Sequence, residues 1–509
     1  MSGSANAFGW LFGGTASSTI WHAGASLNGD ILRSVYLSKI QTDEQDIVFT
    51  SSQTDDLKYN YPLIDLWLGT LHTDYADRYL HVPVFYGQKP IRVWSAGGNF
   101  MEYVTGERYF MAYEDLRTKK LDKMEVKLSY NDIVKSFDFT YHQTPSSRLQ
   151  LESLRENTLP PYRFTYNTSS LPGYLSDKHD HWGYFNNRTP LYSDYSAFHT
   201  YREPDFRYTE AGPLTKIQYP TGGVKKLIYE PHYYNRRVLR NKYSGNLSLE
   251  TVPQSIGGGL RIKEIHEKDS YEDLLVKSYV YSPGILNGKP EYYWPGYRGK
   301  LINGYEYTAD RFYSQSLLPV SNNPAGGSVS YTTVSEILQG NGKIEYTFTN
   351  HDTRMDENSQ GSIDPQKTAY SPLTSKNLER GMITEIKYYA EGSSTPSKRE
   401  TFTYAALNDF KEFIKGVYFR RLNLFGSMEV NAIEGSAYKN YVYPYNVTKK
   451  TEYYAYPGNL TQSFEYTYAY NHLNQIKTET KTDHIHTVST AYKYPCDYGT
   501  PVYQNIWRL

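Results

Sequence analysis

The chain has 509 residues, 39% of them hydrophobic, and its 54 Lys and Arg residues balance its 54 Asp and Glu residues. This hydrophobic content excludes a disordered chain, and the zero net charge excludes a global field that would attract nucleic acid or an anionic membrane. A single hydrophobic core stops growing at roughly 250 to 300 residues, so we expect more than one core.

The start of the chain predicts neither a secretory signal nor a membrane anchor. Residues 1–26 are rich in Gly, Ala and Ser, without the basic start and the uninterrupted apolar stretch of a signal peptide. No segment approaches the ~18 consecutive apolar residues that a membrane-spanning helix needs. The single cysteine, Cys496, can form neither an intrachain disulfide nor a Cys-based zinc site.

Alternating apolar and polar residues predict antiparallel hairpins along most of the chain. In chain order, the clearest hairpin joins residues 124–130 to 137–141 through Asn131-Asp132, and the next joins residues 217–219 to 227–229 through the turn 220–223. A third is indicated by Ile344, Tyr346 and Phe348 after the turn Gly340-Asn-Gly342. Such two- to four-residue turns favour Asn, Asp and Gly because these residues tolerate positive φ.

The C-terminal region shows the same pattern with tyrosine. Phe464, Tyr466, Tyr468 and Tyr470 alternate with other residues, so we expect their rings on one, largely buried, face. Pro444 lies between further tyrosines and predicts an edge or a strand end. Helical periodicity is scarce, and only residues 408–415, closed by Gly416, are predicted to form two helical turns.

These patterns predict an all-β protein of antiparallel hairpins in large twisted sheets, with very little helix. The 54 tyrosines support this fold, because the ring suits a pleated surface and the hydroxyl tolerates partial exposure. We predict an N-terminal segment (1–26), an aromatic-rich β region (27–212) and a β-hairpin repeat region (213–509). The boundary lies at Gly212-Pro213, and a further division is expected near residue 371.

Several motifs resemble one family. Tyr470-Asn-His-Leu-Asn-Gln-Ile476 resembles a degenerate form of the Tyr-Asp-x-x-Gly-Arg-Leu unit of the YD, or RHS, repeat proteins, although Asn471, Asn474 and Gln475 depart from it. The order of the segments 180–184, 214–223 and 258–262 is similar to that in large RHS-like proteins of Bacteroidetes. The resemblance spans residues 30–509.

This resemblance implies a curved or shell-like β-hairpin structure and a protein that is exported or associated with the cell surface. RHS relatives often enclose a C-terminal toxin that is released by self-cleavage. Here strand and turn patterns continue to Leu509, and no Asp-Pro-x-Gly boundary motif is recognisable. We therefore expect no toxin cargo within this chain.

Two aromatic clusters are the candidate binding residues. His179 and His181 at i and i+2 would share one face of a strand and offer two ligands to a metal, but a packed corner under Trp182, with Gly183 allowing a close backbone approach, is the favoured interpretation. Tyr and Trp rings can also stack on sugars or anchor a partner protein. The candidate residues are His179, Asp180, His181, Trp182, Tyr184, Tyr292, Tyr293 and Trp294.

Other motifs favour structural roles. Gly257-Gly-Gly259 precedes a predicted strand, so it indicates a bend or bulge instead of a phosphate-binding loop. Residues 356–364 place oxygen ligands at calcium-loop positions, yet Lys367 stands where the bidentate Glu belongs. Asp483 and the two histidines after it are expected to be solvated. We predict no metal and no cofactor.

Three functions from different classes remain open. A non-enzymatic structural or scaffold module of RHS-like type leads, because regular hairpins dominate and no catalytic motif occurs. The alternatives are a glycan- or protein-binding β module and a glycan-active enzyme. The hypothesis of a glycan-active enzyme stays open because a glycosidase needs two carboxylates at a given distance in space, at no fixed spacing in sequence. Any two of the 54 carboxylates could form such a pair.

Overall fold

The computed structural model describes most of the chain from residue 38 onward. The described ranges are 38–41, 45–53, 58–61, 65–72, 82–86, 92–95, 99–104, 107–112, 119–128, 133–142, 148–172, 176, 178–189, 198–241, 246–269, 273–300, 306–313, 327–358, 373–406, 412–421, 433–458, 460–494 and 497. The predicted N-terminal segment 1–26 lies outside them. Within these ranges, no helix has the length and apolar character needed to span a membrane.

The protein is an all-β structure built on one 20-stranded sheet. Its first strands along the chain follow one another as antiparallel neighbours, with β1 at one end of the sheet. Their bounds are β1 Lys39–Gln41, β2 Gln45–Gln53, β9 Lys119–Leu128, β10 Ile133–His142, β11 Gln150–Glu156, β12 Tyr162–Tyr166, β13 Leu214–Gln218 and β14 Val224–Arg240.

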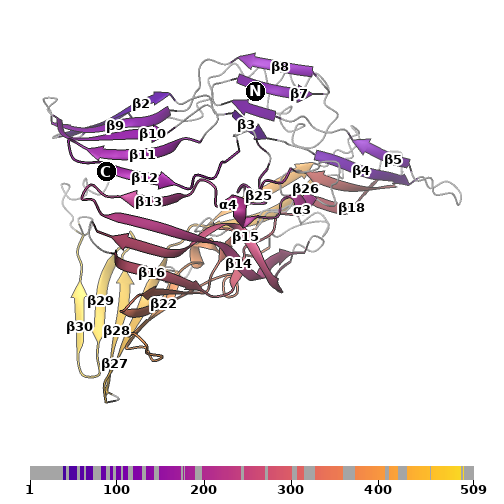
Figure 1. Ribbon diagram of the computed structural model, residues 1–509. Helices are drawn as coiled ribbons and strands as arrows, with labels where there is room; N and C mark the ends of the chain where they lie inside the picture. Colours follow the sequence, from indigo (N-terminus) through magenta and orange to yellow (C-terminus); the bar gives the residue numbers. More distant parts are fainter. Residues whose placement is uncertain are drawn as a thin grey trace.

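The antiparallel order continues without a break to β30 at the other end of the sheet. These strands are β15 Leu247–Lys268, β16 Asp273–Tyr281, β21 Thr333–Leu338, β22 Gly342–Phe348, β23 Ile383–Tyr389, β24 Lys398–Ala406, β27 Tyr445–Tyr456, β28 Leu460–Tyr470, β29 Ile476–Thr482 and β30 Thr487–Ala491. In Figure 1 strands β9–β13 are roughly horizontal, whereas β27–β30 are roughly vertical. The direction changes because the twist between neighbouring strands accumulates across the sheet.

Segments inserted between these strands form the other elements. Strands β17 Gly284–Leu286 and β20 Val329–Ser330 join the large sheet, with β17 parallel to β14. Among the described residues, two four-stranded sheets and one hairpin are separate from it, and three short helical elements occur in the connections. The first four-stranded sheet contains β3 Lys58–Tyr61, β6 Arg92–Ser95, β7 Asn99–Val104 and β8 Glu107–Ala112, and the second contains β4 Asp65–His72, β5 Val82–Tyr86, β18 Tyr293–Lys300 and β19 Glu306–Tyr313. The hairpin consists of β25 Phe413–Arg421 and β26 Ile433–Tyr441. The helical elements are α3 Phe198–Tyr201, α4 Phe206–Thr209 and the 3-10 helix η2 Asn377–Glu379.

The three predicted hairpins are confirmed. Strand β9 pairs with β10, β13 with β14, and β21 with β22, all antiparallel. The predicted glycine turns have the backbone that only glycine adopts without strain, with φ of +92° at Gly222, +76° at Gly340 and +97° at Gly342. Pro444 lies between the end of β26 and the start of β27, which confirms the predicted strand end.

The C-terminal tyrosine face is confirmed in direction but not in depth. Phe464, Tyr466, Tyr468 and Tyr470 of β28 all lie on one side, and each is half-buried instead of buried. The cover comes from lysine: Lys481 Nζ lies 4.1 Å from the centre of the Phe464 ring. Long lysine side chains cover apolar surface with their methylene groups and keep the charge in water.

The predicted helix at 408–415 is wrong where the structure describes it. Residues 413–415 belong to strand β25, which pairs antiparallel with β26, and residues 408–411 lie outside the described ranges. Phe413, Ile414 and Val417 are residues with high β propensity, and cross-strand pairing outweighs a weak local helical pattern.

The predicted domain division stays a prediction. Strand pairing continues across the proposed boundary at Gly212-Pro213, because Tyr166 of β12 pairs with Leu214 of β13. The proposed division near residue 371 lies outside the described residues. A small buried core of Tyr234, Leu286 and Val329 lies where β14 meets the inserted strands, and Trp182 packs against it.

Candidate functional site

The predicted aromatic clusters meet on the β14–β15 hairpin, near Gly258 and Gly259 of β15 and Tyr234 of β14. Three segments pack there, namely residues 178–189, residues 198–210 and residues 284–292, and we call them together with the β14–β15 surface the junction. The first two belong to the connection between β12 and β13, and the third begins with β17, which pairs with β14. The junction therefore unites residues that are far apart in the sequence.

A glycine bulge in β15 receives two aromatic rings. The pairing register shifts where Pro231 faces Leu260 and His232 faces Gly257, so two residues are extruded, which confirms the predicted bulge. A Cβ atom on Gly258 would lie 2.4 Å from Cε3 of Trp182, and one on Gly259 would lie 2.9 Å from the Tyr184 ring. Only glycine at these positions allows the rings to sit directly on the strand.

Asp180 fixes the turn that carries these rings. Its Oδ1 accepts hydrogen bonds from the backbone N–H groups of Trp182 (2.8 Å) and Tyr184 (3.0 Å), and its own N–H donates to the carbonyl of Tyr184 at 2.7 Å. The side chain is fully buried, and this burial raises its pKa to about 6. Asp180 thus satisfies backbone donors that a buried loop would otherwise leave unpaired.

One premise of the metal alternative and one detail of the predicted corner are wrong. Residues 180–184 form a tight turn closed by a bridge between His179 and Phe185, so His179 and His181 do not share a strand face. Gly183 has open space around its missing Cβ and is required for its φ of +94° instead. The close approach occurs instead at Gly258, where the Trp182 ring packs against the backbone of β15.

His181 joins the first aromatic cluster to the second. Its ring stacks on Tyr292 at 5.6 Å between centres, and its Nδ1 lies 3.2 Å from the Tyr292 hydroxyl. Tyr292 is only 3% exposed and packs edge-on against Phe198 of α3. The Tyr292 ring therefore offers no open face to a ligand. The side chains of Tyr293 and Trp294 lie outside the described residues.

Charged groups surround these rings in pairs. His181 Nε2 lies 3.8 Å from Oε1 of Glu203, Glu203 also pairs with Lys289, and the Arg202 guanidinium lies 5.0 Å from the Phe198 ring centre. Burial lowers the pKa of His181 to about 4. Burial alone would raise the pKa of Glu203, but its contacts with His181 and Lys289 outweigh burial and lower this pKa to about 2. At neutral pH, Glu203 is ionised and His181 is neutral.

The geometry does not assemble a metal site in the described part of the chain, where no group of three His, Cys, Asp or Glu side chains converges. The candidate calcium loop begins at Asp356, and this carboxylate is buried against Arg380. Glu357 pairs with Lys376 and Asn358 Nδ2 donates to Asn246 Oδ1, whereas residues 359–364 lie outside the described ranges. His486 is 74% exposed in the turn between β29 and β30, as expected for a solvated histidine.

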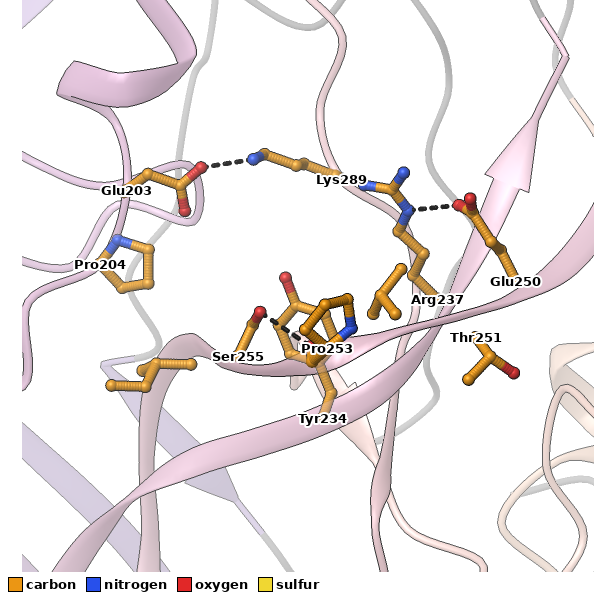
Figure 2. Close-up of a pocket in the computed structure, with 11 residues that line it drawn as sticks. Glu203, Pro204, Tyr234, Arg237, Glu250, Thr251, Pro253, Ser255 and Lys289 are labelled. Atoms are coloured by element: carbon orange, nitrogen blue, oxygen red, sulfur yellow. Dashed lines mark hydrogen bonds and ion pairs between the residues drawn. The ribbon is translucent and has the colours of Figure 1, made fainter.

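A hollow of about 660 Å³ opens beside the junction, as Figure 2 shows. One wall carries the Glu203–Lys289 ion pair, and another carries Arg237, whose Nε lies 2.8 Å from Oε2 of Glu250. The remaining lining residues are Pro204, Tyr234, Thr251, Val252, Pro253, Ser255 and Ile256.

No sequence motif predicted this hollow. Its walls come from three separate segments, and Arg237 meets Glu250 only through the β14–β15 register. The one local signal was Pro253, since a proline inside a long strand pattern indicates a bulge or an edge. A second register shift does occur there, between Tyr234 and Arg236.

The two carboxylates of the hollow do not have the electrostatics of a glycosidase pair. Such a pair needs one carboxylic acid with a raised pKa, and here Glu203 has a pKa lowered to about 2 while Glu250 is paired with Arg237. The hollow is therefore better suited to binding than to acid catalysis.

A comparison of the chain with protein-family models gives no match, and a comparison with curated proteins gives none either.

Proposed function

We propose that this protein is a non-enzymatic structural scaffold of RHS-like type, associated with the cell surface or with a secreted effector. The observation that supports this proposal most directly is the unbroken antiparallel order from β1 to β30, in which inserted segments leave the sheet and return without interrupting it. Such a sheet gives a large, twisted surface in which each strand of this order between β1 and β30 pairs with a neighbour on both sides.

The side chains support the same proposal. At the junction, where polar groups are buried, they hold the chain in place: Asp180 binds backbone N–H groups, and Asn186 Nδ2 donates to the carbonyls of Tyr201 and Glu203, each at 3.0 Å. Buried polar groups that are engaged in this way specify one conformation of an irregular loop.

The enzymatic alternative can be tested directly. Purified full-length protein is incubated with a panel of oligosaccharides and polysaccharides, and reducing ends are measured over time. We expect no turnover. Hydrolysis that disappears in both Glu203→Gln and Glu250→Gln variants would show that the protein is a glycan-active enzyme.

The scaffold itself is tested by its shape and location. Small-angle scattering of the purified protein should give one well-defined, non-spherical particle, and limited proteolysis should leave the sheet from β9 to β30 resistant. In the source organism, protease added to intact cells should remove a terminal epitope tag, even though the sheet itself resists cleavage. A tagged protein that stays protected until the cells are lysed would contradict the surface association.

A further inference from the structure

We propose that the hollow beside the junction binds a neutral carbohydrate. This inference goes beyond the scaffold role and does not depend on it. The hollow lies between Glu203 and Lys289 on one side and Arg237 and Glu250 on the other (Figure 2), and its volume of about 660 Å³ falls within the roughly 300–1,000 Å³ of small-molecule sites.

The charges in the hollow balance. Glu203 pairs with Lys289, and Glu250 pairs with Arg237, so two anionic and two cationic groups line one small space. An anionic ligand would be attracted by the two cations but repelled by both carboxylates, and a cationic ligand would be repelled by both cations. A neutral ligand avoids both penalties, and it leaves both ion pairs intact.

Hydroxyl groups match this lining best. A sugar hydroxyl donates one hydrogen bond and accepts others, so neighbouring hydroxyls can bind a carboxylate and a cation at once. Arg237 contacts Glu250 through Nε, and this contact leaves its two terminal amino groups available for further hydrogen bonds. These amino groups form a planar fork that suits adjacent hydroxyl oxygens.

The apolar part of the lining fits the other face of a sugar ring. Pro204, Val252, Pro253 and Ile256 line the hollow, and the register shift between Tyr234 and Arg236 extrudes the β15 residues that include Val252 and Pro253. Bulges of this kind occur next to binding sites because they change the direction of side chains. Aliphatic side chains can cover the C–H groups of a pyranose while the charged groups bind its hydroxyls.

The test uses full-length protein and a panel of common neutral mono- and disaccharides. Binding is measured by saturation-transfer NMR and isothermal titration. Glucuronic acid and glucosamine serve as the anionic and cationic analogues of glucose. We expect saturable binding of at least one neutral sugar, weakened about tenfold by Glu250→Gln and by Lys289→Gln, as for the loss of one good hydrogen bond to a charged group.

Glu267→Gln is the matched control. Glu267 pairs with Lys225 across the same β14–β15 hairpin and is 38% exposed, close to the 43% of Glu250, yet it does not line the hollow. This variant should bind as the unmodified protein does, and thermal unfolding confirms that all three variants are folded. No binding by any neutral sugar, binding of only the charged analogues, or equal weakening by Glu267→Gln would overturn the proposal.

Discussion

The junction and the C-terminal strands β27–β30 solve the same stability problem in different ways. In the junction, loops lie on a long hairpin, and fully buried groups such as Asp180 and Phe198 hold them. In β27–β30, regular strands carry half-buried rings with charged side chains between them.

The C-terminal strands distribute their stability over many weak contacts. Glu452 of β27 accepts hydrogen bonds from Tyr454 (3.1 Å) and Tyr466 (3.2 Å) and pairs with Lys450 at 2.6 Å. Of these residues only Glu452 is buried, whereas Lys450, Tyr454 and Tyr466 are half-buried, so each contact contributes on the order of 1 kcal/mol. The comparison teaches that single substitutions should affect the junction strongly and the C-terminal strands weakly.

The largest expected effect is acid sensitivity outside the C-terminal strands. Burial lowers the pKa of His179, His181, His232 and His351 to about 4, below the value of about 6.5 in the unfolded chain. The unfolded state therefore binds these protons first, and stability is lost as the pH falls from about 6.5 to about 4.

Asp180 acts in the opposite direction. Burial raises its pKa to about 6, so the folded state binds this proton first and stability is gained as the pH falls through the same window. Four histidines against one aspartate leave a net uptake of about three protons on unfolding, a loss of several kcal/mol in the free energy of unfolding. Urea titrations between pH 7 and pH 4 measure it, and a flat pH profile would contradict the burial of these histidines.

Trp182→Ala should lower the free energy of unfolding by about 3 kcal/mol, the low end of the range for truncated core aromatics, because its large indole ring is only partly buried. Trp182 contacts the core of Tyr234, Leu286 and Val329. Tyr184→Ala is the matched control, since its ring sits on the neighbouring glycine but is 42% exposed. Equal losses in the two variants, measured by chemical denaturation, would mean that Trp182 does not anchor the junction.

Gly258→Ala should cost about 1–3 kcal/mol through overpacking, because the new Cβ would lie 2.4 Å from Trp182. In the Trp182→Ala background the same change should cost much less. The double-mutant cycle isolates this coupling. Additive costs would show that Gly258 is required for its backbone and not for the ring.

Tyr468→Ala should cost about 1–2 kcal/mol, below the 3–5 kcal/mol typical of buried aromatic residues. The reason is that its ring is half-buried on β28, so truncation removes only part of the apolar area from contact. A loss as large as that of Trp182→Ala would show that the C-terminal sheet has a deep core or a covering partner.

The smallest effect concerns the lysine cover of that face. Lys481→Ala should cost about 0.5–1 kcal/mol, the range of exposed cation–π contacts, because Lys481 Nζ lies 4.1 Å from the Phe464 ring centre. In a double-mutant cycle with Phe464→Leu, most of this cost should appear as interaction energy between Lys481 and Phe464. Zero coupling would assign the cost to the lysine methylene groups alone.

The sequence by itself determined the elements that depend on neighbouring residues. Hairpins follow from period-two patterns and from turns that require glycine, as at Gly222 and Gly340, and the bulge follows from Gly257-Gly-Gly259. The turn at 180–184 was located but mistaken in its geometry, because its shape depends on Asp180 binding the backbone N–H groups of Trp182 and Tyr184.

Only the tertiary structure decided which distant residues meet. The His181–Tyr292 contact spans 111 residues and the Lys289–Glu203 pair spans 86, and no local pattern encodes either. They form because the antiparallel strand order brings two connecting segments to the same hairpin. Their polar groups need hydrogen-bond or ion-pair partners wherever the chain buries them. Strand pairing therefore sets the hollow and its paired charges, and no sequence motif predicts them.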